Sequence, residues 1–312
     1  MQLKKQEVFS IAQYIPFTDE QKRHASAIDL EAFLRSRGEC LLRSGKDKRL
    51  ASDRSVTVRG SEWYDHAAGQ GGGPVSFLQR FYRMSYPEAM RSLLGGAYPA
   101  ARESVPQPRK AFTLPDASAD MRRVYAYLMK QRHIGKDVID HFVKAGLLYE
   151  DAKHHNCVFV GTDAHGVPRH AHRRSTNSSG EAFRANVESS DPRYSFHHIG
   201  GDGSLYVFEA PIDLLSYITL HPDRWREHSY VACCGTSFQP VQELLPRADK
   251  VFLCLDNDDA GQKACQRMTE QSGQWDVEVN RLVPKHKDWN EDLVQQCQTR
   301  EMKPLCQTMY CP

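Results

Sequence analysis

The chain has 312 residues, of which 40% are hydrophobic and 26% are charged, and its formal net charge at pH 7 is +2. These proportions are typical of a globular protein and exclude a disordered chain. No apolar run approaches the roughly 20 residues that a membrane helix needs. The N-terminal segment MQLKKQEVFS also lacks the apolar core of a signal peptide. We therefore expect a cytoplasmic protein that has no membrane partner.

The nine cysteines and fourteen histidines are scattered along the chain. No C-x-x-C pair occurs, and Cys233 and Cys254 fall in apolar, strand-like runs, which favours buried thiols. We therefore expect no zinc.

Residues 1–200 carry a basic excess and residues 201–312 an acidic one. This is the distribution expected if the first part holds a polyanion and the last part holds cations, although chance also produces splits of this size.

Proline marks a boundary in the first half of the chain. The segment 85–95 predicts a helix that begins after Ser85, has Pro87 and Glu88 in its first turn and stops at Gly95. Residues 97–118 contain four prolines and no periodicity, which is typical of a linker. We therefore predict an N-terminal module over 1–96, a linker over 97–118, a middle subdomain over 119–203 and a C-terminal domain over 204–312.

The middle subdomain reads as α+β. Residues 120–134 and 135–148 predict two amphipathic helices, and 156–163 and 169–176 predict two strands joined by a turn. The C-terminal domain alternates regularly between the two kinds of element. Strands are predicted at 204–210, 230–235, 250–258 and 275–283, with helices between them at 211–221, 239–248 and 260–273. This alternation predicts βαβ crossovers and a mainly parallel, Rossmann-like α/β sheet.

Carboxylates follow the predicted strands of this sheet. Glu209 ends the first strand, Asp256 and Asp258 end the third, Asp288 follows the fourth, and Asp213 lies one helical turn after Glu209. Functional groups of open parallel sheets gather beyond the carboxyl ends of the strands. Carboxylates gathered this closely repel one another unless cations offset the charge, and an all-oxygen ligand set suits Mg²⁺ or Mn²⁺. The alternative for any one aspartate is a turn or a helix cap.

The same residues carry a family resemblance. The segments FEAPID (208–213), CCGTSF (233–238), LDNDDAGQKA (255–264) and HKDWNEDL (286–293) resemble the successive motifs of the toprim domain, which bacterial primases, topoisomerases and some nucleases share. The resemblance implies that Glu209, Asp256 and Asp258 are the metal ligands. It implies that Asp213 and Asp288 are accessory acidic residues of the catalytic site, and that Gly235 and Thr236 form its glycine-threonine turn.

The sequence before this domain resembles bacterial primase more loosely. Residues 127–151 are similar to the helical start of the primase polymerase domain, and residues 158–180 with 193–210 resemble the region just before toprim. Residues 62–96 resemble the end of the primase zinc ribbon without its cysteines, because Asp65 and Ala68 stand about where two of them would be. The resemblance therefore implies a zinc-ribbon-like module without zinc, packed around Trp63, Phe77 and Phe81. The combination is similar to toprim proteins of plasmids and conjugative elements.

The resemblance implies a primase-like nucleotidyltransferase that makes primers on single-stranded DNA from nucleoside triphosphates, with Mg²⁺ or Mn²⁺ as cofactor and a helicase or replication protein as a further partner. Nucleotide or nucleic-acid binding is expected of the basic middle segment, of the segment after the fourth strand and, by stacking, of one aromatic of the N-terminal module: Arg169, Arg173, Arg174, Arg184, Lys287 and Trp63. For each arginine the alternative is a solvated surface. Two other functions stay open, a metal-dependent toprim nuclease and a non-catalytic DNA-binding accessory protein.

Overall fold

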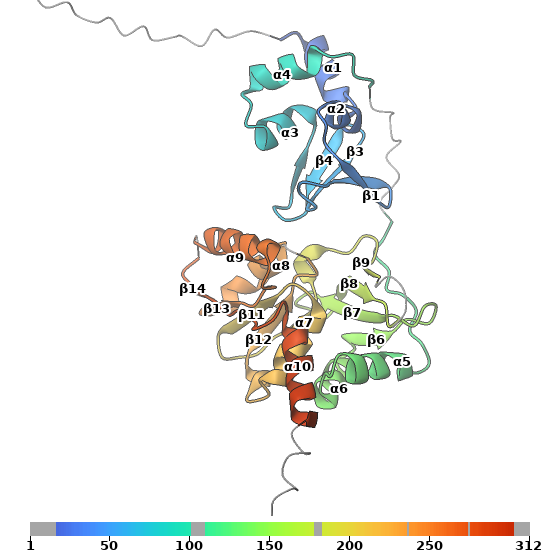
Figure 1. The fold of residues 1–312 in the computed structure, drawn as a ribbon, viewed down its shortest axis with the longest axis vertical. Coiled ribbons are helices and arrows are strands. Elements are labelled where there is room, and N and C mark those ends of the chain that lie inside the picture. The colour runs from blue at the N-terminus through green and yellow to red at the C-terminus, as the bar shows by residue number, and fades with distance from the viewer. Residues whose placement is uncertain (1–16, 101–109, 178–182, 236, 274, 303–312) are drawn as a thin grey trace, which may run out of the picture. The chain divides into compact units, whose positions relative to one another are not determined.

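The structure is a computed structural model that describes residues 17–100, 110–177, 183–235, 237–273 and 275–302. The chain divides into two compact units (Figure 1). Unit 1 comprises Met1–His66 and Gln70–Gln107, and unit 2 comprises Ala67–Gly69 and Pro108–Pro312. In the described part of the chain, no helix is both long and apolar enough to cross a membrane.

Unit 1 is built on an antiparallel meander of five strands in the order β1-β2-β3-β4-β5. Its described elements are α1 (Asp19–Ala27), α2 (Leu30–Ser36), β1 (Leu41–Ser44), β2 (Asp47–Leu50), β3 (Val56–Arg59), β4 (Glu62–Asp65), β5 (Gln70–Gly72), α3 (Pro74–Phe81) and α4 (Tyr86–Leu94). Val58 pairs with Trp63 across β3 and β4, and both side chains are buried in the core beneath the helices. The predicted helix at 85–95 is confirmed as α4. It begins at a capping box in which the Glu88 carboxylate accepts from the Ser85 N–H at 2.7 Å.

The middle part of unit 2 is the predicted α+β segment. It contains α5 (Arg122–Ala126), a π-helix η1 (Tyr127–Gln131), α6 (Lys136–Lys144), β6 (Leu148–Glu150), β7 (Cys157–Thr162), β8 (Pro168–Arg174) and β9 (Arg184–Asn186). The four strands form an antiparallel sheet in the order β6-β7-β8-β9. The two predicted helices and the predicted hairpin of β7 and β8 are confirmed.

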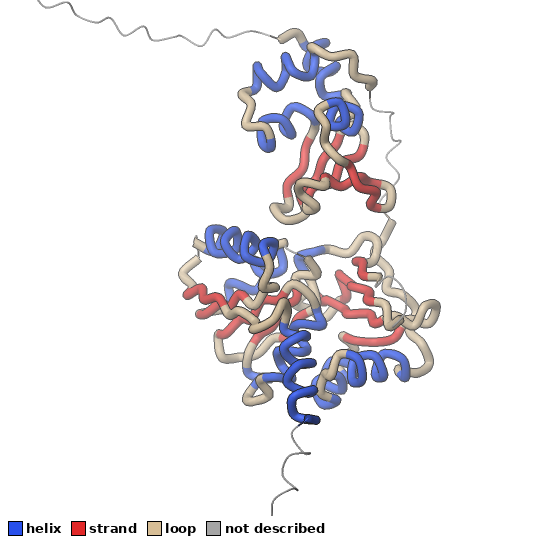
Figure 2. The backbone as a smooth tube through the Cα atoms, in the orientation of Figure 1, coloured by secondary structure: helices blue, strands red, loops and turns tan. Residues whose placement is uncertain are grey.

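The C-terminal part of unit 2 contains the predicted parallel sheet. Its elements are β10 (His197–His198), β11 (Ser204–Phe208), α7 (Pro211–Leu220), β12 (Ser229–Ala232), α8 (Gln239–Leu244), β13 (Lys250–Leu253), α9 (Asp259–Ser272), β14 (Glu278–Arg281) and α10 (Trp289–Met302). The order is β10-β12-β11-β13-β14, and all pairs are parallel except β10 with β12. Figure 2 distinguishes the strands, in red, from the helices, in blue. The prediction of a mainly parallel sheet is therefore confirmed, with β10 as an additional antiparallel edge strand.

Helices cover both faces of this sheet. One face packs against α7 and α10 through a cluster that includes Phe208, Tyr230 and Trp289. The other face packs against α8 and α9 through a cluster that includes Val207 and Met268. The first cluster also contains residues of α5, α6 and β7, so the middle part and the parallel sheet share one hydrophobic core.

Both described ends of the predicted linker at 97–118 contribute to folded units. In unit 1 the Pro99 carbonyl accepts from the Asp29 N–H at 2.9 Å. In unit 2 Phe112 and Leu114 pack against the cluster of β7 and β8 that includes Val160. The linker residues 101–109 lie outside the described part of the chain.

Candidate active site

The predicted carboxylates lie where the parallel strands end. Glu209 directly follows β11, Asp256 follows β13 by three residues, and Asp258 is the N-cap of α9. Asp288 immediately precedes α10, and Asp213 lies in the first turn of α7. Four of the five are partly exposed, whereas Asp213 is buried. We call these five residues the acidic edge.

The side chains of the acidic edge act on one another electrostatically. Burial, followed by the charges of Glu209, Asp288 and Asp258, raises the pKa of Asp256 to about 7. Burial, followed by the charges of Asp288, Asp256 and Glu209, raises the pKa of Asp213 well above its usual range. Burial also raises the pKa of Glu209, and the neighbouring Asp258 and Asp288 contribute to that rise. Residues from four separate segments are therefore close enough for their charges to interact, as the sequence predicted.

Three of these carboxylates also accept a backbone hydrogen bond through one oxygen, two of them from a residue three positions later. The Oδ1 atom of Asp258 accepts from the Gly261 N–H at 2.9 Å, and that of Asp288 accepts from the Glu291 N–H at 2.8 Å. The Oδ1 atom of Asp213 accepts from the Asn290 N–H at 3.3 Å. The alternative considered from the sequence, helix capping, therefore holds for Asp258 together with its place on the acidic edge.

Glu209 and Asp256 differ from the other three. Within the described residues, their side chains make no hydrogen bond and no ion pair with a lysine or arginine. Their charge therefore has no direct partner in the protein, although both are half-buried. A carboxylate in that situation favours either a proton or a cation.

No three histidine, cysteine, aspartate or glutamate side chains of the described residues are grouped closely enough to hold a metal ion. The predicted ligands Glu209, Asp256 and Asp258 thus share an edge but do not form a finished coordination site. Their chemistry nevertheless fits a hard divalent cation, because the donors are all carboxylate oxygens and two of the three carboxylates lack other partners.

Glycine at position 261 permits the turn between β13 and α9. A Cβ atom placed there would lie 2.1 Å from the Asp256 carbonyl oxygen, far inside van der Waals contact. The absence of a side chain lets the first turn of α9 approach the backbone of Asp256. This close approach brings Asp256 and the N-cap Asp258 to the same edge.

The turn after β12 also borders the acidic edge. The Gly235 N–H donates to the Glu209 carbonyl at 3.1 Å, and Gly235 has φ +147°, which favours glycine. Cys234 has φ +53°. Thr236, the other residue of the predicted glycine-threonine turn, lies outside the described residues.

Three of the predicted basic residues lie near the acidic edge or face it. The charges of Arg184 and Lys287 both lower the pKa of Glu209, against the larger effect of its burial. Arg174 lies directly opposite Arg184 in the register of β8 and β9. These three cations make no ion pair with a carboxylate in the part of the chain that the structure describes. Like charges at paired positions of a sheet repel, so this arrangement favours an anionic ligand.

Arg132 is a further cation that the sequence analysis did not select. Its Nε atom donates to the Tyr127 hydroxyl at 2.9 Å, and the Nε atom of Arg174 donates to the same hydroxyl at 3.3 Å. Two guanidinium groups therefore meet at one phenolic oxygen. Tyr127 lies in the π-helix, and such widened turns frequently occur at functional sites. The amphipathic pattern of the sequence does not reveal a π-helix, so this signal is visible only in the structure.

Arg169 and Arg173 are placed differently. Arg169 donates from Nε to Asp163 at 2.8 Å across the hairpin turn of β7 and β8, which gives it a structural partner. Arg173 alternates with Arg174 along β8 and so projects from the opposite face of the sheet, where its guanidinium lies 5.5 Å from the centre of the Phe183 ring. The structure therefore does not bring these two arginines to the acidic edge.

Trp63 is buried, with 5% of its surface exposed. Its Nε1 donates to the Gly73 carbonyl at 3.1 Å and to Ser76 Oγ at 3.0 Å, and its ring packs edge-on against Phe77 and Phe81. The expectation that Trp63 stacks on a nucleic acid base therefore needs correction, because its ring is enclosed by core residues. Its other expected role, as the centre of the packing of the N-terminal module, agrees with these contacts.

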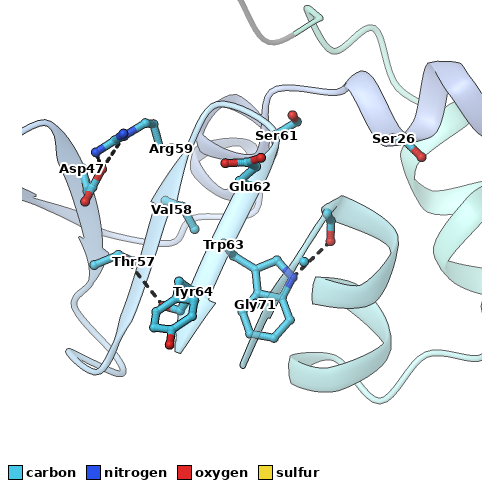
Figure 3. Close-up of a pocket in the computed structure, with 12 residues that line it drawn as sticks. Ser26, Asp47, Thr57, Val58, Arg59, Ser61, Glu62, Trp63, Tyr64 and Gly71 are labelled. Carbon is cyan, nitrogen blue, oxygen red and sulfur yellow. Dashed lines mark hydrogen bonds and ion pairs between the residues drawn. The ribbon is translucent and has the colours of Figure 1, made fainter. Parts of the chain in front are cut away.

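Next to it on β4, Tyr64 is 39% exposed and lines a pocket of about 610 Å³ in unit 1 (Figure 3). The glycines of β5 form part of this pocket, and Arg59, which is paired with Asp47, borders it.

Asp65, at the position of an expected cysteine, accepts from Arg80 at 2.9 Å and from Ser55 at 3.1 Å. These contacts show how a polar side chain is accommodated at that position.

Comparisons with known proteins match unit 2 in two consecutive segments. Residues 126–202 match a family described as a protein of unknown function (DUF3991), and residues 206–293 match a family described as Toprim-like. An uncharacterized protein of Bacillus anthracis is 25% identical over 276 residues, which cover 81% of this chain and 79% of that protein.

Solved structures that resemble the chain include two primases. The primase fragment of the bacteriophage T7 primase-helicase protein has a TM-score of 0.44 at 15% identity, covering 81% of this chain and 94% of that one. The zinc-binding and RNA polymerase domains of Aquifex aeolicus primase have a TM-score of 0.41 at 17% identity, covering 92% and 84%.

The Toprim-like match spans β11 to the first turn of α10 and includes all five carboxylates. The domain predicted from FEAPID, LDNDDAGQKA and HKDWNEDL is thus confirmed by an independent comparison. Residues 206–293 are a toprim-like domain, and the acidic edge is the edge at which its strands end.

Proposed function

We propose that the chain is a primase-like nucleotidyltransferase that extends nucleic acid chains on a single-stranded DNA template. The observation that supports this best is that carboxylates and cations of unit 2 lie side by side without pairing with one another among the residues that the structure describes. Five coupled carboxylates lie at the end of the toprim-like sheet. Cations without carboxylate partners among the described residues lie beside them: Arg132, Arg174, Arg184 and Lys287. Such a pairing suits a substrate that brings both phosphates and divalent cations.

In this proposal Glu209, Asp256 and Asp258 would hold Mg²⁺ or Mn²⁺. When bound, such ions neutralise the charge of the phosphates and help to align the attacking and leaving oxygens. The 3′-oxygen of the growing chain forms a bond to the α-phosphorus of the nucleotide. The bond from that phosphorus to the bridging oxygen of the β-phosphate breaks, pyrophosphate leaves, and the hydroxyl proton passes to solvent at the exposed side of the acidic edge.

The arginines of the middle sheet supply the protein's own contacts to the substrate. Arg174 and Arg184 lie opposite each other and present guanidinium groups that can each bind phosphate oxygens in pairs. Lys287, on the loop before α10, is an exposed cation whose charge also acts on Glu209. Together these side chains would orient the triphosphate and compensate its charge.

Unit 1 would bind the template strand. The exposed ring of Tyr64 lines an open pocket, and Arg49 on β2 lies on the same face of the sheet, since Arg49 pairs with Thr57 and Thr57 pairs with Tyr64. An exposed aromatic ring and a cation on one face suit single-stranded nucleic acid, which is held by stacking and by charge. We further propose that the protein acts in replication of a plasmid or conjugative element, with a helicase or replication protein as partner.

The decisive experiment incubates labelled single-stranded DNA with the protein, Mg²⁺ or Mn²⁺ and nucleoside triphosphates. We expect extended or newly made strands from the wild type and none from Asp256→Ala. Asp259→Ala is the matched control, because Asp259 is the exposed neighbour of Asp258 on α9, and it should keep full activity.

The two competing functions give different results in the same assay. Shortening of the labelled DNA without any extended product would identify a nuclease. DNA retention that is unchanged in Asp256→Ala, with no chemistry in either protein, would identify an accessory DNA-binding protein. Either result would contradict the proposed polymerisation.

A further inference from the structure

Asn290 is a buried residue next to the acidic edge that makes hydrogen bonds through both its backbone and its side chain. Only 4% of its surface is exposed. Its backbone N–H donates to Asp213 at 3.3 Å, and its side-chain Nδ2 donates to Ser216 Oγ and to the Arg132 carbonyl, both at 2.9 Å. Its Oδ1 accepts from the Arg132 guanidinium at 3.0 Å. One side chain therefore connects α10, α7 and the residue that ends the π-helix.

The contacts between Asn290 and Arg132 determine how the Arg132 side chain is oriented. Asn290 binds both the main chain and the side chain of Arg132, so it fixes the residue at two points. The guanidinium is held at a third point by the Tyr127 hydroxyl and lies 5.2 Å from the centre of that ring. A long, flexible arginine is thereby confined to one orientation, which lowers the entropy that binding an anion would otherwise cost.

These contacts keep Arg132 available for a ligand. Its partners are an amide oxygen and a phenolic oxygen, both uncharged acceptors, and no carboxylate of the described residues pairs with it. The residue is half-buried, so its charge is incompletely solvated. A cation that is oriented but not neutralised is suited to bind a phosphate.

We infer that Asn290 is a positioning residue that holds the Arg132 guanidinium beside the acidic edge, where Arg132 contacts a phosphate of the nucleotide. This inference rests on the proposed nucleotidyl transfer and names two residues of the same site. Asn290 itself does not touch the substrate. The role requires the asparagine amide group, because an aspartate of the same shape would lack the donors to Ser216 and to the Arg132 carbonyl.

The variant Asn290→Ala separates the two functions of this position. Alanine retains the backbone N–H that donates to Asp213, but it releases the Arg132 side chain. We therefore expect Mn²⁺ binding to stay at the wild-type affinity, while the KM for nucleoside triphosphate rises on the order of tenfold and kcat changes less. Asn280→Ala is the matched control, because Asn280 lies on β14 and, among the described residues, its side-chain amide donates a hydrogen bond to Glu278 alone. It should leave both quantities unchanged.

A second variant tests the same point independently. Arg132→Lys keeps the charge but loses the planar fork that Asn290 and Tyr127 hold, so the same rise in KM is expected. Because both changes act through one contact, the double variant Asn290→Ala with Arg132→Lys should have about the same KM as Arg132→Lys alone. If Asn290→Ala does not fold, Arg132→Lys still decides the question.

The outcomes distinguish this inference from the proposed function. A wild-type protein that makes no product overturns the proposed function and the inference with it. An active wild type whose Asn290→Ala or Arg132→Lys variant keeps the wild-type KM overturns the inference alone. A loss of Mn²⁺ affinity in Asn290→Ala would also overturn it, because the residue would then act through Asp213 and the acidic edge.

Discussion

At the scale of single residues, the raised carboxylate pKa values predict that the metal-free protein loses stability as pH rises. Because the folded pKa of Asp256, about 7, exceeds its unfolded value, folding favours the protonated form. That contribution is complete below the unfolded pKa and is lost as pH rises through 7. Between pH 6.5 and 8.5 the remaining part of this contribution, about 0.8 kcal/mol, is lost, so we expect Tm in a chelator to fall by about 2–3 °C.

Two controls make this result specific. Asp256→Asn should flatten the dependence of Tm on pH over the same range, because the substituted side chain does not titrate. Saturating Mg²⁺ or Mn²⁺ should raise Tm at pH 8.5 in the wild type more than in the variant. A wild-type Tm that is constant or rises with pH in this range would show that burial and the neighbouring carboxylates do not raise the pKa of Asp256.

Gly261 offers a test of how the edge is assembled. In Gly261→Ala the new methyl group would meet the Asp256 carbonyl, so α9 must move away from the strand end. We expect a loss of about 1–3 kcal/mol in the free energy of unfolding, typical of overpacking. We also expect weaker Mn²⁺ binding, measured by calorimetric titration. Gly273→Ala, at the C-terminal end of the same helix, is the control. The nearest atom to its Cβ would lie 3.3 Å away, so it should retain the wild-type affinity.

Among single residues, the sequence indicated the carboxylates of the acidic edge more completely than the cations beside it. Glu209, Asp256 and Asp258 were predictable because each follows an apolar strand, and the ends of parallel strands share an edge. An arginine near a strand gives no such signal. Whether it faces the site depends on alternation, which separates Arg173 from Arg174, and on partners that are distant in sequence, as Asn290 is from Arg132.

At the scale of elements, periodicity predicted the helices and strands whose pattern lies within one continuous segment of the sequence. The helices and parallel strands of the toprim-like domain were predictable because each carries an apolar run of the right length between turn residues. The two-residue strand β10 was not, because its pairing with β12 comes from a distant segment. The π-helix was also missed, since one widened turn hardly changes the helical pattern.

Glu150 is a buried residue on β6 that connects this strand to α5 and to the turn before β7. Its Oε2 accepts from the N–H groups of Arg123 and Val124 at the start of α5, both at 3.1 Å, and its Oε1 contacts His155 Nδ1 at 2.6 Å. Only 1% of Glu150 is exposed. Glu150→Ala leaves these donors without their acceptor, so we expect a loss of about 2–4 kcal/mol in the free energy of unfolding, measured by urea denaturation.

The control for this change is Glu188→Ala, which removes an exposed ion pair with Lys110. Surface pairs of this kind contribute about 0–1 kcal/mol. If the two variants lose similar stability, the proposed capping of α5 by Glu150 contributes little to the fold.

At the scale of the whole molecule, the chain combines two compact units with different kinds of surface. The boundary follows the proline-rich segment that the sequence indicated, although the residues at both described ends of that segment belong to folded units. The acidic edge lies entirely within unit 2, and the pocket beside Tyr64 lies entirely within unit 1. The proposed chemistry and the proposed template binding can therefore be changed separately by single substitutions.

Tyr64→Ala in the full-length chain tests this division. If the exposed ring stacks on a template base, its removal should weaken the binding of single-stranded DNA by about 1–3 kcal/mol, roughly a factor of 5 to 150. The affinity for Mn²⁺ should not change, because the acidic edge is untouched. Tyr86→Ala is the matched control, since Tyr86 is similarly exposed in unit 1, at 41%, but lies on α4 away from the pocket. Fluorescence anisotropy with a labelled oligonucleotide measures both variants, and equal affinities would place the template on another surface of the protein.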